Sequence, residues 1–146
     1  MRALGIDLGS KRIGVALSDS GGVLASPYET VERSGDRAVD HRRLLALADE
    51  AEVDALVVGL PIALDGSIGP AADGVLAEVD ELRAAASVPV ETYDERLTTV
   101  TATRLLRERG MSGKAMRKVV DQVAAAVILQ SWLDGRRSDG RPPPGP

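Results

Sequence analysis

The first residue that could do chemistry is Asp7, which ends a short apolar run and precedes a glycine-rich segment. A carboxylate at the end of a buried strand destabilises a fold unless it is paired or binds a cation. Gly9 and Gly14 would allow the backbone to approach a phosphate or another strand closely. Asp7 is therefore a candidate metal ligand or part of a phosphate-binding loop, and the alternative is a turn acid that accepts hydrogen bonds from nearby amides.

A second group of candidates lies at Tyr93–Thr99, where Asp94, Glu95 and Arg96 precede two threonines. The segment lies where a predicted strand ends and a predicted helix begins. One acid could bind a metal ion while Arg96 pairs with the other acid or with a phosphate. The alternative is a helix N-terminus at which the helix dipole favours acids.

The third candidate is Asp121, the one acid in an otherwise apolar helical stripe. Charged residues are seldom buried without a partner. Asp121 is therefore a third candidate ligand, or it forms an ion pair with Arg117 or Lys118 one helical turn earlier. The small alanines that follow it would let this helix lie close to a sheet.

Composition limits the chemistry to carboxylates, hydroxyls, Lys, Arg and the backbone. The chain has no Cys and one His, which excludes disulfides, thiolate zinc sites and a Cys nucleophile. His41 lies far in sequence from every candidate acid, and we expect it to be exposed on a helix surface. Two Tyr, one Trp and no Phe are too few for the stacking platforms that bind single strands.

Positive charge is concentrated just before Asp121. The formal net charge is −4, yet residues 101–120 hold six Lys or Arg and one acid. These basic residues, among them Arg107, Arg109 and Lys114, are either a solvated helix surface or a path that leads a phosphate backbone to the acids.

Hydrophobic periodicity predicts the elements that must position these residues. Pro61–Ile68 is expected to be a loop, either a rigid ligand-binding loop at the carboxyl edge of the sheet or an ordinary connection. Residues 134–146 are expected to be a disordered tail after a single domain over residues 1–133. We predict strands at 2–7, 11–18, 23–31, 55–59 and 88–93, and helices at 36–52, 69–86, 98–108 and 116–133.

This order predicts an α/β fold with a mixed five-stranded sheet flanked by helices, whose first two strands form a hairpin. An actin-like ATPase, which begins with a similar phosphate loop, needs two such domains, and 146 residues supply one. No targeting segment or membrane span is visible, so we expect a soluble, cytoplasmic protein.

Four ordered motifs resemble the bacterial YqgF/RuvX family, whose members are described as Holliday junction resolvases and as nucleases that mature the 5′ end of pre-16S rRNA. The resemblance covers about residues 1–133. The motifs are D-x-G-x-x-R-x-G-V-A-x-S-D (7–19), V-V-G-L-P-x-x-x-D-G (57–66), D-E-R-L-T-T (94–99) and V-D-x-x-A-A-x-x-I-L-Q-x-W-L (120–133).

The resemblance implies a ribonuclease H-like fold and a metal-dependent nuclease. It implies Asp7, Glu95 and Asp121 as catalytic acids, which with Asp94 are the candidate ligands of Mg²⁺ or Mn²⁺. We expect Asp7, Glu95 and Asp121 to converge at the carboxyl edge of the sheet, close enough to share an ion. The predicted nucleic-acid-binding residues are Arg12, Arg96, Arg107, Arg109 and Lys114.

Three functions follow from the resemblance. The first is hydrolysis of phosphodiesters in pre-16S rRNA during ribosome biogenesis, by a monomer or a homodimer. The second is cleavage of branched DNA. The third is a catalytically inactive module that binds nucleic acid or protein. The better characterised resolvases carry an acid where this chain has Gly59, and two acids on the last helix where it has only Asp121, followed by Ala124 and Ala125.

Overall fold

The computed structural model describes residues 1–100 and 113–138. The sequence explains where two of its helices begin. Asp36 caps the first by accepting a hydrogen bond from the amide of Ala38 at 3.0 Å, and Pro70 occupies the first turn of the second. The described elements are β1 (Ala3–Leu8), β2 (Arg12–Ser18), β3 (Ala25–Glu32), α1 (Arg37–Glu50), β4 (Ala55–Leu60), α2 (Pro70–Ala85), β5 (Val90–Asp94), a 3₁₀ helix η1 (Glu95–Leu97) and α4 (Lys114–Ser138).

The strands form one mixed sheet in the order β3-β2-β1-β4-β5. β1, β2 and β3 pair antiparallel, whereas β1 pairs parallel with β4 and β4 with β5. All six residues of β4 are buried, as expected for a parallel strand covered on both faces. The predicted mixed sheet and the hairpin of its first two strands are confirmed.

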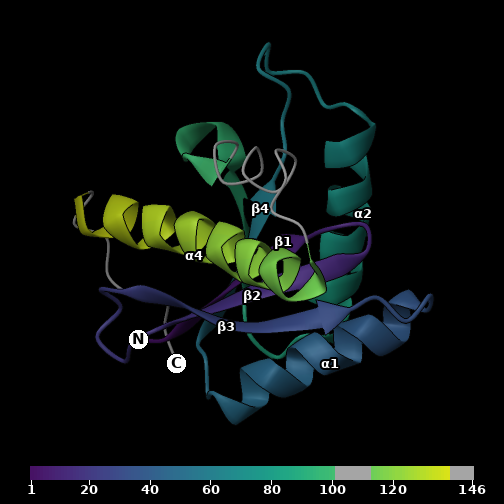
Figure 1. Cartoon of the computed structure of the whole chain (residues 1–146). Coiled ribbons are helices and arrows are strands. Elements are labelled where there is room, and N and C mark those ends of the chain that lie inside the picture. Colours follow the sequence, from purple (N-terminus) through teal and green to yellow (C-terminus); the bar gives the residue numbers. More distant parts are fainter. Residues whose placement is uncertain (101–112, 139–146) are drawn as a thin grey trace.

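Helices cover both faces of the sheet: α4 crosses one face, and α1 and α2 lie on the other (Figure 1). Because side chains alternate along a strand, β1 contributes to two hydrophobic cores. Leu4 and Ile6 belong to the core under α1 and α2, and Ala3 belongs to the core under α4. A Cβ on Gly5 would lie 2.7 Å from Leu129 Cβ of α4, so glycine lets this helix approach β1 closely.

Some predicted boundaries differ from the structure. α4 continues to Ser138, whereas we predicted a helix end at Leu133 and a disordered tail from residue 134. Residues 139–146 and most of the predicted helix 98–108 lie outside the described residues. The sequence did not predict η1, in which the chain turns immediately after β5.

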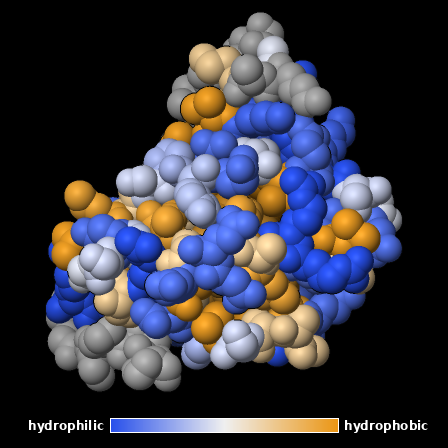
Figure 2. Space-filling view, turned by 90° about the horizontal axis from the view of Figure 1, so that it is seen from below, coloured by the Kyte–Doolittle hydropathy of each residue, from blue (hydrophilic) through white to orange (hydrophobic). Residues whose placement is uncertain are grey.

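Figure 2 shows the molecule from the side on which α1 lies. Hydrophilic residues cover most of this face, and hydrophobic residues appear between them in small patches. Among the helices of the described residues, none is long and apolar enough to span a membrane.

Candidate functional site

The candidate site is built on one row of residues that crosses the sheet. Asp7 of β1 is paired with Gly14 of β2. On the other side of β1, Ile6 is level with Val58, so Asp7 is level with Gly59 of β4. Neighbouring residues in such a row point to the same face of a sheet. Asp7, Gly14 and Gly59 therefore all face α4, and two glycines flank the acid.

The two glycines leave the space that the other two acids occupy. A Cβ on Gly14 would overlap the backbone carbonyl oxygen of Asp121, and a Cβ on Gly59 would lie 2.8 Å from Oε2 of Glu95. Glycine at these positions thus allows α4 and η1 to approach the end of β1. The structure thus places Asp121 beside Gly14 and Glu95 beside Gly59, in the row that holds Asp7.

All three acids are buried, with residue exposures of 5% for Asp7, 5% for Glu95 and 2% for Asp121. Buried carboxylates require compensating hydrogen bonds or positive charge. Within residues 1–100 and 113–138, no three His, Cys, Asp or Glu side chains are grouped so as to hold a metal ion. The shared ion that we predicted from the sequence therefore stays a prediction.

Arg12 supplies positive charge to this edge of the sheet. Its Nε donates a hydrogen bond of 2.7 Å to Oδ2 of Asp121, and the two side chains are 13% and 3% exposed. In the sequence analysis, an ion pair with Arg117 or Lys118 was the alternative to a metal-binding role for Asp121. In the structure the partner that is seen is Arg12, from the opposite end of the chain.

A cavity of about 300 Å³ lies beside this ion pair. Its lining includes the hairpin turn at residues 9–11, Arg12, Arg117 and Asp121. Three of these residues, Lys11, Arg12 and Arg117, are basic, so the cavity suits an anionic ligand such as a phosphate. Of the other predicted nucleic-acid-binding residues, Arg107 and Arg109 lie outside the described residues, as does the side chain of Lys114.

Asp94 and Arg96 pair with each other at the start of η1. Nη2 of Arg96 lies 2.7 Å from Oδ2 of Asp94, and Nε lies 3.1 Å from each carboxylate oxygen. These hydrogen bonds hold the pKa of Asp94 below its usual value. Both carboxylate oxygens of Asp94 are therefore engaged by Arg96, whereas Oε2 of Glu95 lies against Gly59 in the row that holds Asp7.

Sequence reasoning missed a second polar group on the opposite face of the sheet. His41, predicted to be exposed, is buried, and its Nε2 lies 2.7 Å from Oε2 of Glu78. Arg33 donates two hydrogen bonds to the same carboxylate, of 2.8 and 3.0 Å. The expectation for His41 was wrong because α1 turns this residue toward α2. A signal was present: Glu78 lies three residues after Val75 and four before Leu82, on the inner stripe of α2.

Comparisons with known proteins match almost the whole chain. A family model described as RuvX, Holliday junction resolvase, matches residues 1–135. A Mycobacterium sp. (strain KMS) protein named "Putative pre-16S rRNA nuclease" is 54% identical over 140 residues, which cover 94% of this chain and 82% of that protein. A Desulforudis audaxviator (strain MP104C) protein of the same name is 46% identical over 138 residues, covering 94% and 97%.

Solved structures support the same fold. The Thermus thermophilus RuvC structure matches with a TM-score of 0.55 and 19% identity, covering 94% of this chain and 97% of that chain. The structure of the same organism's RuvC in complex with a Holliday junction substrate matches with a TM-score of 0.55 and 18% identity, covering 94% and 96%. The predicted ribonuclease H-like fold is confirmed.

Proposed function

We propose, on the premise that this chain belongs to the RuvX family, that it hydrolyses phosphodiester bonds of precursor 16S rRNA with the help of a divalent metal ion. Membership of the family, which the sequence motifs predict, makes the chain a nuclease that binds nucleic acid. The name of the relatives supports precursor rRNA as the substrate. The corresponding role is maturation of the 5′ end of that RNA in the cytoplasm, during ribosome biogenesis.

The observation that carries the proposal is the burial of three carboxylates at one sheet edge, from β1, η1 and α4. Buried carboxylates are costly even when they are paired, and a fold that only had to be stable would often gain from apolar residues there. Functional sites of open α/β sheets also lie at the carboxyl ends of the parallel strands. Asp7, Glu95 and Asp121 are thus proposed as the catalytic acids.

The donor chemistry fits Mg²⁺ or Mn²⁺, since these ions prefer carboxylate oxygens. Asp7, Glu95 and Asp121 would hold the ion, which would supply activated water and stabilise the leaving oxygen. Asp121 is engaged by Arg12, so its full participation requires Arg12 to turn from the carboxylate to another anion. A phosphate of the substrate is such an anion, and Arg12 lines the cavity that would receive it.

A second candidate function is cleavage of branched DNA. The family is described as a Holliday junction resolvase, and the fold is that of RuvC. Phosphodiester chemistry at a sheet edge does not by itself distinguish RNA from DNA. The choice between the two substrates therefore needs a direct comparison.

The test is cleavage of precursor 16S rRNA and of a four-way DNA junction in parallel, with Mg²⁺ or Mn²⁺ and again with EDTA. The full chain is compared with Asp7→Asn, which keeps the side chain's shape but removes its charge. We expect metal-dependent cleavage of the RNA by the unaltered chain and none by the variant, because a neutral amide is a weak ligand for these ions. Binding of the RNA should be retained, since one repulsive charge has been removed.

A matched control is Asp80→Asn, which changes an acid whose side chain is 81% exposed on α2. It should cleave as the unaltered chain does. Equal cleavage by Asp7→Asn would show that the activity comes from another source, and the catalytic assignment would be withdrawn. Cleavage of the junction alone would select the second candidate, and binding without metal-dependent cleavage would select an inactive module.

A further inference from the structure

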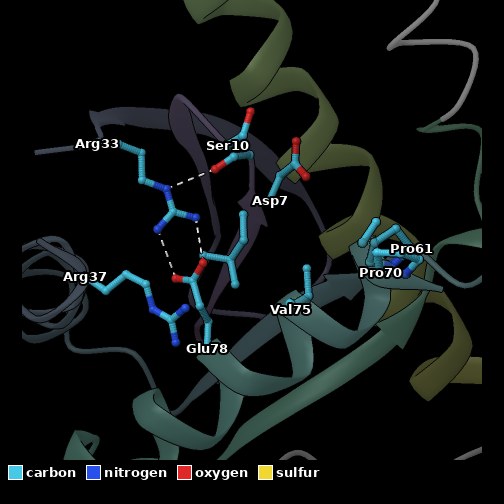
Figure 3. A pocket seen from close by; sticks show the side chains of 12 residues that line it. Asp7, Ser10, Arg33, Arg37, Pro61, Pro70, Val75 and Glu78 are labelled. Carbon is cyan, nitrogen blue, oxygen red and sulfur yellow. Dashed lines mark hydrogen bonds and ion pairs between the residues drawn. The ribbon is translucent and has the colours of Figure 1, made fainter. Parts of the chain in front are cut away.

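A larger cavity, of about 440 Å³, lies at the same end of the sheet but on the α1 and α2 side (Figure 3). Its apolar lining includes Leu8, Pro61, Pro70 and Val75, from the end of β1, the residue after β4, and α2. Its polar lining includes Ser10, Arg33 and Glu78. A volume of this size is within the range of small-ligand sites, about 300–1,000 Å³.

The cavity adjoins the acidic edge of the sheet. Gly9 and Ser10 line both this cavity and the basic cavity beside Asp121, so the hairpin turn forms the ridge between the two. Asp7 also contributes to the cavity lining. Figure 3 shows its carboxylate pointing away from Arg33 and Glu78. One polymer chain crossing the turn could thus reach the acids and the cavity together.

The polar side of the cavity is held rigidly. Arg33 donates two hydrogen bonds to Glu78 and a third, from Nε, to the backbone carbonyl oxygen of Gly9 at 3.0 Å. Nε2 of His41 lies 2.7 Å from Oε2 of the same carboxylate. Burial raises the pKa of Glu78, but the hydrogen bonds from Arg33 and His41 outweigh it and lower the pKa below its usual value. The Glu78 carboxylate therefore keeps its charge near neutral pH.

Positive charge also lies at the mouth of the cavity. Arg37, in the first turn of α1, lines the cavity and forms an exposed ion pair with Glu81. At the start of α2, the backbone amides of the first turn are not capped by a side chain, because the residue before the helix is Gly69. These features would suit a nucleotide. The apolar wall would contact the base, Arg33 and Glu78 would contact its polar edge, and Arg37 would contact its phosphate.

We propose that this cavity binds one unpaired nucleotide of the substrate strand, next to the phosphodiester bond that is cleaved. The base would lie against Leu8, Pro61 and Val75, with its polar edge toward Arg33 and Glu78. Its phosphate would lie toward Arg37. Enzymes that act on nucleic acids read extruded bases in such pockets through hydrogen bonds and apolar contacts. This inference rests on the proposed function and would make cleavage depend on an unpaired nucleotide.

Gly74 provides a direct way to fill the cavity. It lines the cavity on α2, and a Cβ built on it meets no atom within 4 Å. Gly74→Leu should therefore occupy the space without displacing the fold, and leucine is a better helix former than glycine. The matched control is Gly135→Leu, which adds the same side chain to an equally open glycine of α4 outside the cavity.

The first measurement is titration of the full chain with each of the four ribonucleoside 5′-monophosphates, followed by NMR. We expect the amides of Gly9, Ser10 and Gly74 to shift in the unaltered chain and in Gly135→Leu. Gly74→Leu should bind about tenfold more weakly or worse, as when a pocket must accommodate extra methylenes. Arg37→Gln should weaken binding of the monophosphates, and Arg42→Gln, on an exposed part of α1, should not.

Equal binding by Gly74→Leu and the unaltered chain would overturn the proposal, and so would equal loss in both glycine variants. Absence of binding by the unaltered chain would overturn it as well. These measurements need no cleavage, so the nucleotide site can fail while the nuclease assignment stands. Conversely, metal-dependent cleavage by the unaltered chain and its loss in Asp7→Asn test the catalytic assignment without any measurement of monophosphate binding, so failure of one proposal is distinguished from failure of the other.

A second measurement uses RNA in which a single abasic nucleotide is moved along the strand. The unaltered chain should lose affinity at one position next to the cleaved bond, and Gly74→Leu should show no position dependence. A flat profile for the unaltered chain would contradict the proposal.

Discussion

Nε of Arg12 donates a 2.7 Å hydrogen bond to Oδ2 of Asp121, which joins the first hairpin of the chain to its last described helix. The pair lies beside the row of residues that holds Asp7, and Asp121 is almost fully buried. The proposed metal ligand on α4 is thus compensated by a guanidinium in this structure. The stability of α4 on the sheet and the binding of a cation should therefore be coupled.

Arg12→Gln tests this coupling. In EDTA, the substitution should lower the free energy of unfolding by about 3 kcal/mol, because it removes one partner of a buried ion pair. Mg²⁺ or Mn²⁺ should then raise the melting temperature of Arg12→Gln more than that of the unaltered chain, since a cation can replace the missing charge. Thermal unfolding with and without metal measures both effects.

Lys11→Gln is the control for this experiment, because Lys11 is an exposed neighbour that lines the same cavity. Its effect on stability should stay within about 0.5 kcal/mol. If Arg12→Gln proves as stable as Lys11→Gln, the ion pair contributes nothing and the coupling is absent.

Gly14→Ala should separate α4 from the sheet. The added Cβ would overlap the carbonyl oxygen of Asp121, and a backbone atom has less freedom to move than a side-chain end. We expect a loss of stability of about 1–3 kcal/mol, together with weaker cleavage as Asp121 is displaced. Chemical denaturation measures the first effect and a cleavage assay the second.

Gly59 and Gly135 provide comparisons for the stability of Gly14→Ala. Gly59→Ala presses mainly on the ends of the Ile128 and Glu95 side chains, so its stability should fall less than that of Gly14→Ala. Gly135→Ala meets nothing within 4 Å in α4 and should be stabilising by up to about 1 kcal/mol. The reverse order of the three stabilities would show that α4 does not depend on a glycine at position 14.

Glu78 should make stability depend on acid pH. Burial raises its pKa, but hydrogen bonds from Arg33 and His41 outweigh burial and hold the pKa below the usual 4.5. A lowered pKa adds stability that is fully present above the unfolded-state pKa and is lost as pH falls through the folded-state pKa. Glu78→Gln should therefore be less stable than the unaltered chain at neutral pH, and the difference should shrink below about pH 4.5.

Urea denaturation at several pH values gives this difference directly. Besides Arg33 and His41, Arg37 is close enough to interact with Glu78, and Asp40 lies beside Arg33 and His41. Glu81→Gln, which alters the exposed pair with Arg37, should change stability by less than about 1 kcal/mol. A difference between Glu78→Gln and the unaltered chain that is constant at all pH values would refute the assignment of this acid dependence to Glu78.

The basic segment before Asp121 should govern the salt dependence of RNA binding. Replacing Arg107, Arg109 and Lys114 with Ala should weaken binding and reduce the slope of log affinity against log salt by about 0.7–0.9 for each phosphate that is no longer neutralised. Fluorescence anisotropy over a range of salt concentrations measures the slope. Replacing Arg42 and Arg43 of α1 is the control, and an unchanged slope for the basic segment would identify it as a solvated surface.

Local patterns in the sequence predicted most of the architecture. The alternation in residues 11–18, the apolar run at 55–59 and the helical stripe at 69–86 each repeat within a single element, so each can be recognised without its neighbours. Their order limited the connections to a mixed sheet with the acids at its edge. Composition also predicted which side chains could bind a metal ion: with no Cys and one His, only carboxylates could form such a site.

Helix ends and local turns were less predictable. α4 runs past Leu133 through Asp134 and Gly135, although glycine often ends a helix. Propensity is a weak signal, and packing of Trp132 and Leu133 against the sheet supports the last turns. The start of η1 depends on a single local contact: the Asp94 carboxylate accepts a hydrogen bond from the amide of Arg96 at 2.9 Å.

The sequence by itself thus determined the mixed five-stranded sheet, its first hairpin, the ribonuclease H-like fold and membership of the RuvX family. Only the tertiary structure decided which distant partner a charged or polar residue takes: Arg12 binds Asp121, and His41 is buried against Glu78. The physical reason is the separation along the sequence of the residues that set each feature. Periodicity is set by neighbours within one element, whereas the partner of a charge depends on which distant segments the packed sheet and helices bring within hydrogen-bonding distance.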